Sequence, residues 1–287
     1  MKRAKTNPAA TFLCIGHCCH DRVCEGLLLG GTASYAALAI RRLGGQVNIM
    51  TSVGADFRYQ SVFEDAGIGF WAKPVARTTV FENIYRGTQR LQYLHERAET
   101  LFPADLPAEW EQPSVVLFCP IAAEVDFSLL QCFPSSLRAA TVQGWLRQWD
   151  AAKRVFPKAM DWGRLAGLDL VIMSDADIEG FESGIPEITR QVPLLVITKG
   201  AQGAIVIEKG EETHFPAFPV TEVDATGAGD TFAAAFLLRY AATRDLGAAV
   251  AYAHAAASFV VEGLGIDRLD ALDRLDERCE QYREMFG

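Results

Sequence analysis

The sequence contains no apolar run of the ~18 residues that a membrane-spanning helix needs. The apolar stretch near its N-terminus is interrupted by His17, His20 and Asp21, which is unlike the core of a signal peptide. Its seven cysteines are odd in number and lack the spacing of a disulfide framework. We therefore expect a protein of the reducing cytoplasm without a membrane partner.

Positive charge is also scarce. Asp and Glu outnumber Lys and Arg by 36 to 27, which gives a formal net charge of −9, and no Lys/Arg cluster is larger than a pair such as Arg41–Arg42. Such a protein repels nucleic-acid phosphates, so nucleic acid is not an expected partner. The chain also lacks a P-loop string and a Gly-x-Gly-x-x-Gly after its first apolar segment, which argues against P-loop enzymes and dinucleotide dehydrogenases.

What the chain does have is an ordinary globular composition, with 50% hydrophobic and 22% charged residues. Its 287 residues suit a large α/β domain, preceded by a frayed tail at Met1–Ala10. Strand-like and helix-like segments alternate, which predicts a doubly wound, mostly parallel sheet. The expected strands are 11–16, 46–53, 115–118, 141–143, 168–173, 194–198 and 204–208, and the expected helices are 34–43, 60–66, 226–240 and 246–263.

The stretch Thr78–His95 breaks this alternation. Its side chains alternate in character on either side of Gly87, which is typical of a hairpin rather than of a strand followed by a helix. Such strands often form a separate small sheet or lid, and no repeat or linker divides the rest of the chain. The expected organisation is one domain over residues 1–287, with lid strands at about 22–29 and 76–97.

The string Asp224-Ala225-Thr226-Gly227-Ala228-Gly229-Asp230 carries the chemistry. Small residues let the backbone approach a ligand closely, and the following helix presents free N–H groups and a partial positive charge at its N-terminus. Together they predict an anion hole for a phosphate. Asp230 would stand beside it as the base that accepts a hydroxyl proton in phosphoryl transfer. The alternative is that Asp230 only caps the helix.

With Thr231 and Phe232 added, this string resembles the C-terminal signature of the ribokinase family, also called the phosphofructokinase-B sugar kinases. Gly30–Gly31, Val53–Asp56 and Ile197–Ala204 extend the resemblance over nearly the whole chain. The resemblance implies a Rossmann-like α/β domain with a small β-sheet lid. It also implies an ATP-dependent kinase that uses Mg²⁺, acts on a small polyol or sugar, and is a monomer or a homodimer paired through its lids.

The resemblance also implies a role for individual residues. The catalytic group would be Asp230, with the anion hole formed by Gly227, Ala228 and Gly229. The substrate would contact Asp21, Gly30, Gly31, Ser34, Gln143 and Arg147. The nucleotide would contact Thr198, Gly200, Gly203, Thr226 and His254, the last of these in the adenine pocket. Asp177 would hold Mg²⁺, while Asp224, with Thr226, would hold a monovalent cation such as K⁺.

Two positions depart from the family pattern. Many relatives have Asn-x-x-Glu where this chain has Ser174 and Asp177, and for Asp177 the alternative is a plain helix-start residue. Tyr35 replaces an Asn that binds sugar hydroxyls. Its single phenolic oxygen argues against a ribose- or fructose-type contact, and its alternative is a core aromatic.

These departures resemble the myo-inositol kinase branch. The resemblance also rests on Gly16–Asp21, Leu29–Tyr35 and Val142–Arg147. A cyclitol carries hydroxyls all round and no ring oxygen, so its pocket needs several donors and acceptors. Asp21, Gln143 and Arg147 are candidates, although Gln143 and Arg147 also suit a strand-end polar pair. We expect a cyclitol kinase, with a nucleoside or furanose-sugar kinase, or a catalytically silent ligand-binding relative, as alternatives.

Overall fold

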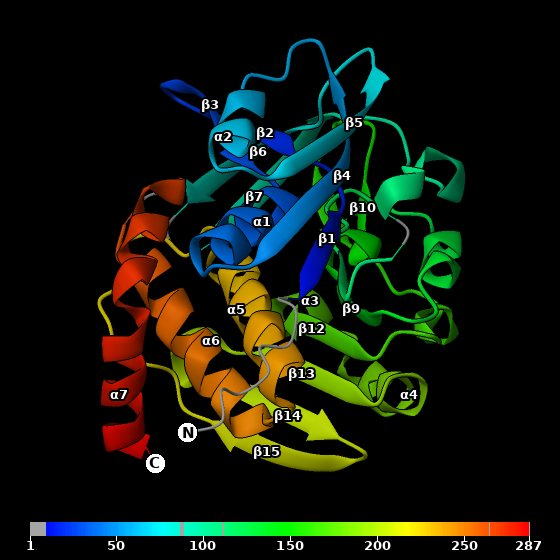
Figure 1. Cartoon of the computed structure of the whole chain (residues 1–287). Helices are drawn as coiled ribbons and strands as arrows, with labels where there is room; N and C mark the ends of the chain where they lie inside the picture. Colours follow the sequence, from blue (N-terminus) through cyan, green and yellow to red (C-terminus); the bar gives the residue numbers. More distant parts are fainter. Residues whose placement is uncertain (1–9, 87–88, 111, 264, 287) are drawn as a thin grey trace.

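The computed structural model describes residues 10–86, 89–110, 112–263 and 265–286, so nearly all of the expected frayed tail and the expected turn at Gly87 lie outside it. A nine-stranded sheet, ordered β15-β14-β13-β12-β9-β8-β1-β4-β5, forms the centre of the molecule (Figure 1). Its strands are β1 (Thr11–Ile15), β4 (Gln46–Gly54), β5 (Gly69–Val75), β8 (Val115–Phe118), β9 (Leu137–Thr141), β12 (Leu170–Ser174), β13 (Leu194–Thr198), β14 (Ala204–Glu208) and β15 (Glu211–Phe215).

Neighbouring strands run parallel from β13 to β5. The antiparallel pairs are β13–β14 and β14–β15, at the other end of the sheet. The prediction of a mostly parallel, doubly wound sheet is therefore confirmed. The inner strands are short apolar runs that are buried on both faces, as in the fully buried β8. The strand expected at 141–143 is placed wrongly, because β9 ends at Thr141 and the polar Arg138 concealed its start.

Helices cover both faces of this sheet. They are α1 (Thr32–Arg42), α2 (Gln60–Asp65), α3 (Asp175–Ile178), α4 (Ile185–Gln191), α5 (Ala228–Thr243), α6 (Leu246–Val260) and α7 (Leu275–Phe286). The longer 3₁₀ segments are η3 (Phe127–Cys132), η4 (Gln143–Leu146), η5 (Trp162–Leu165) and η8 (Gly265–Arg274), with shorter ones at 103–105, 108–110, 182–184 and 200–202. Among the described helices, none is long and apolar enough to cross a membrane.

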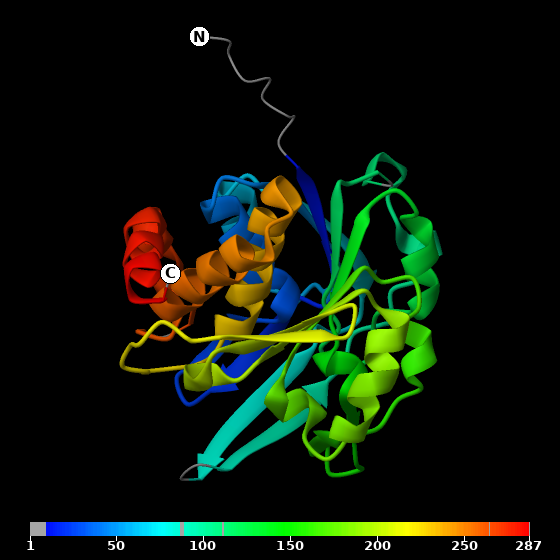
Figure 2. The same cartoon turned by 90° about the horizontal axis from the view of Figure 1, so that it is seen from below.

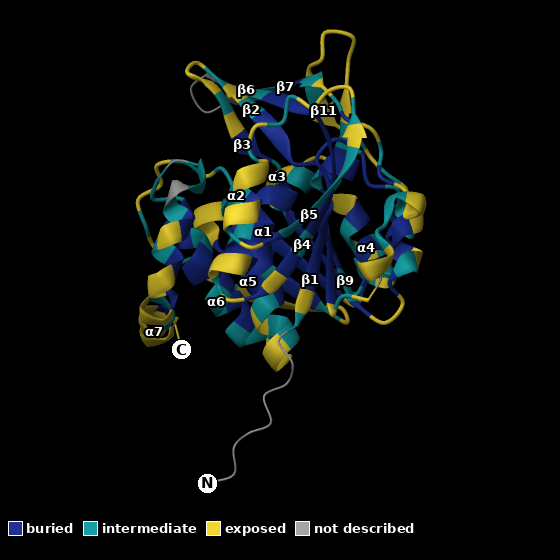
Figure 3. Cartoon of the chain, turned by 45° about the horizontal axis from the view of Figure 1, so that its top comes forward, coloured by how far each residue is buried: buried dark blue, intermediate teal, exposed yellow. Residues whose placement is uncertain are grey.

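Alternation along β1 divides the core into two layers. Phe12 and Cys14 pack with α1, α5 and α6, whereas Leu13 and Ile15 pack with the 3₁₀ segments and α4 on the other face. Figure 3 shows this buried centre between the more exposed outer surfaces of the helices. The long helices α5 and α6 lie side by side on the first face, and α7 packs against α6 (Figure 1).

A separate four-stranded sheet, ordered β3-β2-β6-β7, forms the expected lid. Its strands are β2 (Cys19–Val23), β3 (Gly26–Gly30), β6 (Val80–Arg86) and β7 (Gln89–Glu96). The β6–β7 hairpin projects away from the main sheet in Figure 2. The first lid hairpin starts at Cys19 rather than near residue 22, and this places Asp21 within a lid strand. A further small ribbon pairs β10 (Arg147–Trp149) with β11 (Val155–Pro157).

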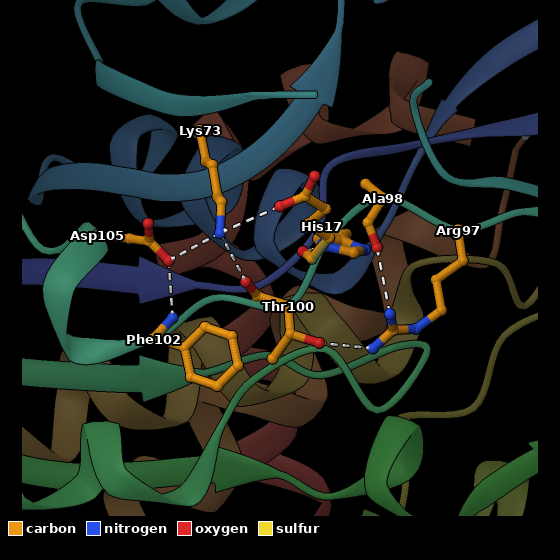
Figure 4. A network of polar contacts seen from close by, with 8 residues as sticks. His17, Lys73, Arg97, Ala98, Thr100, Phe102 and Asp105 are labelled. Atoms are coloured by element: carbon orange, nitrogen blue, oxygen red, sulfur yellow. Dashed lines mark hydrogen bonds and ion pairs between the residues drawn. The ribbon is translucent and has the colours of Figure 1, made fainter. Parts of the chain in front are cut away.

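The segment that follows the lid is tied to the main sheet by a polar network (Figure 4). Lys73 on β5 places its ammonium 3.4 Å from the carboxylates of Glu99 and Asp105. The His17 ring, which follows β1, lies with its Nε2 2.9 Å from the Glu99 carbonyl. Arg97 donates hydrogen bonds to neighbours in the same segment. The network fixes where the lid leaves the body of the molecule.

Candidate active site

A cavity of about 280 Å³ lies at the carboxyl ends of the main-sheet strands, between this edge and the lid. Open α/β sheets bind their ligands at this edge, where the strand order reverses. Of the expected site residues, those lining the cavity are Asp21, Gly31, Gln143, Arg147, Asp177, Thr198, Thr226, Gly227, Gly229 and Asp230. Those that do not line it are Gly30, Ser34, Gly200, Gly203, Asp224, Ala228 and His254.

The N-terminus of α5 opens into this cavity. Gly227 is the N-cap with φ 80°, a conformation that favours glycine, and a Cβ there would collide with the Tyr35 ring. The Ala228 N–H donates to the Ala225 carbonyl at 3.2 Å, so it is engaged within the loop. The next amide of this first turn, that of Gly229, belongs to a residue on the cavity wall and can serve an anion.

Asp230 is the third residue of α5 and lines the cavity. The N-cap is Gly227, so the helix-capping alternative for Asp230 does not describe this structure. Its carboxylate stands in the same first turn as the Gly229 amide, where the helix dipole favours negative charge. The arrangement places a proton acceptor beside an anion-binding position.

The loop before α5 is ordered by Asp224. Its Oδ1 accepts hydrogen bonds from the Thr226 amide at 2.9 Å and from the Thr226 hydroxyl at 2.7 Å. The amides of Val223 and Asp224 donate to the Val261 carbonyl, which follows α6. Asp224 therefore shapes the loop that precedes α5.

Tyr35 forms part of the cavity wall next to the first turn of α5. Its ring is buried on α1, packs against Gly227 and lines the cavity wall. Burial raises the pKa of its phenol, and the charges of Asp21 and then Asp230 raise it further. The phenol thus keeps its proton, and Tyr35 is both a core aromatic and a wall of the site.

The two glycines before α1 stand where any side chain would collide with a neighbouring group. A Cβ on Gly30 would collide with the Asp21 carboxylate, and one on Gly31, which has φ 96°, would collide with the His17 carbonyl. Ser34 is fully buried and donates its hydroxyl to the Gly30 carbonyl at 2.9 Å. Gly30 and Ser34 therefore support the position of Asp21 from outside the cavity.

Gln143 and Asp177 meet at the carboxyl ends of two neighbouring strands. Gln143 Nε2 donates to Asp177 Oδ1 at 3.0 Å, and Asp177 Oδ2 accepts from the Ser174 amide at 2.9 Å. Ser174 caps α3 in return, so Asp177 is also the helix-start residue that the sequence offered as its alternative. Arg147 donates to the Ile121 carbonyl at 3.0 Å and lies over the Phe81 ring.

A magnesium ion at this wall would need oxygen ligands from water and a bound phosphate in addition to those of the protein. Mg²⁺ commonly takes one or two protein carboxylates and fills its other positions with water and phosphate oxygens. Asp177 is a half-buried carboxylate on the cavity wall, which suits such a contact. Within the described ranges, no group of three or more His, Cys, Asp or Glu side chains is arranged to hold a metal alone.

Of the expected nucleotide residues, Thr198 and Thr226 line the cavity and the others lie outside it. Thr198 ends β13, and its hydroxyl donates to the Met173 carbonyl at 3.3 Å. His254 lies away from the cavity on α6, with its ring edge-on to Phe232 and stacked 6.0 Å from Tyr282. Burial lowers the pKa of His254 from 6.5 to about 4, so its ring is neutral at pH 7.

The lid supplies two cavity residues that sequence reasoning missed. Asn83 on β6 and Gln92 on β7 are directly opposite in the hairpin, and Gln92 Nε2 donates to Asn83 Oδ1 at 2.9 Å. The alternating pattern of the hairpin identified the strands. The pattern did not show which face of the hairpin would line the cavity, so this pair could not be selected from the sequence.

A buried carboxylate behind the site was also missed. Glu124 is fully buried and accepts hydrogen bonds from the amides of His17, Ile121 and Ala122 at 2.6 to 3.0 Å. These amides follow β1 and β8, the two central strands. Glu124 thereby fixes the loops that carry Ile121 to the cavity wall.

Comparison with known proteins identifies the kind of chain that carries this site. The model of the pfkB family of carbohydrate kinases matches residues 92–270. A fructokinase from Klebsiella pneumoniae is 28% identical over 247 residues, which cover 76% of this chain and 80% of that protein. An inositol 3-kinase from Oryza sativa subsp. japonica is 27% identical over 252 residues, covering 78% and 61%.

Solved structures show the same fold. A pyrophosphate-dependent kinase of the ribokinase family, complexed with a pyrophosphate analogue and myo-inositol, superposes with a TM-score of 0.77 at 23% identity, over 91% of this chain and 98% of that one. A fructokinase from Xylella fastidiosa with bound ATP gives 0.76 at 19% identity, over 95% and 99%. The family model covers more than half of the residues, and the fold is ribokinase-like. The chain therefore belongs to the pfkB family of carbohydrate kinases and is a phosphotransferase with a sugar or polyol as acceptor.

Proposed function

We propose that this chain transfers the γ-phosphate of ATP to a hydroxyl of a cyclitol such as myo-inositol. The supporting observation is the cavity in which Asp230 and the first turn of α5 share a small space with Asp21, Gln143 and Arg147. One wall can accept a proton and bind a phosphate, and the others present polar groups to a substrate rich in hydroxyls.

In this mechanism Asp230 takes the proton from the attacking hydroxyl. The amides of Gly229 and Asp230 stabilise the charge that develops on the transferred phosphoryl group. Mg²⁺, bound with the donor phosphates, would neutralise further charge, with Asp177 holding it through water. The lid strands that carry Asp21 would exclude water from the closed site.

The remaining assignments concern the nucleotide and a second cation. We assign the donor side to Thr198, Gly200, Gly203, Thr226 and His254. Asp224 and Thr226 are the residues proposed for a monovalent cation such as K⁺, because they shape the loop that enters the anion-binding turn. A potassium titration of the rate at fixed ionic strength, with sodium as the control, tests this second cation.

The cyclitol assignment rests on polar groups on several sides of the cavity. Asp21 and Asn83 come from the lid, and Gln143 and Arg147 come from the main-sheet side. Tyr35 supplies one phenolic oxygen where sugar kinases of the family have an amide. The inositol 3-kinase of rice and the myo-inositol complex of the fold relative add support.

A substrate panel tests the proposed function. Myo-inositol, ribose, fructose, cytidine and adenosine are each incubated with the protein and Mg-ATP, and ADP release is measured. We expect turnover with myo-inositol and little with the others. Phosphorylation of ribose or cytidine but not of inositol would overturn the assignment. Tight binding without any ADP formation would indicate a catalytically silent ligand-binding relative.

Pyrophosphate is a second candidate donor, because α7 covers part of the expected adenine side. Tyr282 stacks on His254 and donates its hydroxyl to the Pro216 carbonyl at 2.7 Å. Arg278 lies 3.6 Å from the Phe259 ring centre and donates to the Ser258 hydroxyl at 3.0 Å. An adenine would have to displace these contacts, whereas pyrophosphate needs only the anion-binding turn.

Donor choice is measured by following inositol phosphate formation with ATP and with pyrophosphate at equal concentrations. Production from ATP supports the first candidate. Production from pyrophosphate alone supports the second, which the fold relative with a bound pyrophosphate analogue makes worth testing.

A further inference from the structure

The hydrogen bond between Gln143 and Asp177 fixes which end of an amide faces the cavity. Gln143 begins η4 after β9, and Asp177 lies in α3 after β12, the parallel neighbour of β9. The 3.0 Å bond therefore bridges the carboxyl ends of two adjacent strands. Both side chains line the cavity and are half-buried, so each can contact a bound substrate.

The chemistry of the two groups sets the orientation. An ionised carboxylate can only accept hydrogen bonds, so the amide nitrogen of Gln143 must face Asp177. Turning the amide over would set its oxygen against the carboxylate and lose the bond. The other oxygen of Asp177 accepts from the Ser174 amide, which holds the carboxylate in place. The carbonyl oxygen of Gln143 is thus left at the end that does not face Asp177.

We propose that Asp177 is a positioning residue that holds the carbonyl oxygen of Gln143 toward the substrate. Held this way, Gln143 presents an acceptor to the substrate and favours a group that donates a hydrogen bond. A cyclitol offers a donating hydroxyl at every ring position, whereas a furanose has at its ring oxygen a group that only accepts. This inference rests on the proposed function, since it concerns polyol recognition in the same cavity, and it gives Asp177 a task separate from holding Mg²⁺.

The orientation predicts a specific pattern of substrate discrimination. Replacing one hydroxyl of myo-inositol by fluorine removes a donor while keeping a similar size. At the position that faces Gln143, this change leaves two acceptors opposed in a partly buried site, which we expect to weaken binding ~10–100-fold. We expect the largest loss at one ring position of the fluorinated series.

The first experiment compares Asp177→Asn with Asp175→Asn, a neighbouring exposed carboxylate on the same short helix that does not line the cavity. An Asn side chain both donates and accepts, so Gln143 can turn over in the first variant. We expect the KM of myo-inositol to rise ~10-fold and the penalty for the fluorinated position to shrink to within ~3-fold. The Mg²⁺ concentration for half-maximal rate should rise as well, because Asp177 is also proposed to hold Mg²⁺, whereas Asp175→Asn should change none of these quantities.

The second experiment restores the bond with reversed chemistry. Gln143→Glu alone sets two carboxylates against each other and should abolish polyol binding. Adding Asp177→Asn lets Asn donate to Glu while a Glu oxygen still faces the cavity, so binding should recover at least ~10-fold over the single variant. If Asp177 acted only by binding Mg²⁺ through its charge, the double variant would show no such recovery.

Calorimetric binding of myo-inositol and its fluorinated analogues separates this inference from the proposed function. Polyol binding with the expected discrimination but without turnover would defeat the kinase proposal alone. A variant Asp177→Asn that loses Mg²⁺ affinity yet keeps the wild-type discrimination would overturn the positioning role. So would a furanose substrate that binds as tightly to the wild type as myo-inositol does.

Discussion

At the scale of single residues, the position of Asp230 gives it a task that its neighbours do not share. It stands in the first turn of α5, beside Gly229 and on the cavity wall. Asp224, six residues earlier, is bonded to Thr226 and shapes the loop. Two aspartates of one motif therefore serve different purposes because of where the helix begins.

The first prediction concerns the proton acceptor. Asp230→Asn keeps the size and shape of the side chain but removes its basicity, so kcat should fall ~10²–10⁴-fold with little change in substrate KM. Steady-state kinetics measures this, and circular dichroism confirms an unchanged fold. A variant with the wild-type kcat would refute the assignment of Asp230 as the base.

The second prediction concerns the cap of α5. Gly227→Ala forces a left-handed conformation on alanine and drives its Cβ into Tyr35, so the free energy of unfolding should fall by about 1–3 kcal/mol. Gly229→Ala is the matched control, because its added Cβ meets no other atom within 4 Å. Urea unfolding of both variants decides the matter, and equal stabilities would contradict the steric explanation.

Some cavity residues could be predicted from the sequence and others could not. Asp21, Gln143 and Asp230 were placed in the site by their motifs, and all three line the cavity. Asn83 and Gln92 were not, because amides in a hairpin look the same whether they face solvent or substrate. Which face of a strand meets a cavity depends on how separate sheets pack, and local patterns do not contain it.

At the scale of elements, loops after the central strands are held by one buried acid. Glu124 accepts the amides of His17, Ile121 and Ala122 and so connects the ends of β1 and β8. Backbone donors that lack an acceptor in a buried site are costly. The geometry of the cavity wall therefore depends on a residue that lies outside the cavity.

The third prediction tests this connection. Glu124→Gln turns one acceptor into a donor that faces backbone N–H groups, so the free energy of unfolding should fall by about 1–3 kcal/mol and the substrate KM should rise. Glu25→Gln, on the exposed turn between β2 and β3, should change neither quantity. Chemical denaturation and kinetics measure both quantities. A Glu124→Gln variant with the wild-type stability and KM would show that the loops keep their positions without the carboxylate.

The elements that sequence reasoning missed are mostly those with little apolar periodicity. β15 exposes nearly every side chain at the sheet edge, and β5 is only partly buried. β2 carries His20, Asp21 and Arg22, and the lid strand expected from about residue 22 therefore began too late. Most buried inner strands, by contrast, are largely apolar and were located to within a few residues, and β9 with its Arg138 is the exception.

At the scale of the whole molecule, acid should destabilise the fold through its buried histidines. Burial lowers the pKa of His254 from 6.5 to about 4, and burial also lowers the pKa of His17 and of His20. As the pH falls below 6.5, the unfolded chain binds protons that the folded chain does not. Stability is therefore complete above that pH and declines as the pH falls toward 4.

The fourth prediction isolates one of these groups. At pH 5 the depressed pKa of His254 should cost the wild type about 2 kcal/mol of folding stability relative to pH 7. His254→Gln should remove that part of the pH dependence, whereas His214→Gln on the exposed β15 is the matched control. Urea midpoints at both pH values test it, and an unchanged pH dependence in His254→Gln would contradict it.

The order of the strands has a consequence for synthesis on the ribosome. The lid hairpins, α1 and the central strands β1, β4 and β8 all precede residue 119, whereas the anion-binding turn and Asp230 lie beyond residue 223. A growing chain thus emerges with its lid strands and central strands well before the turn and the carboxylate that complete the cavity wall. The cavity can take its final form only once synthesis has reached the last quarter of the protein.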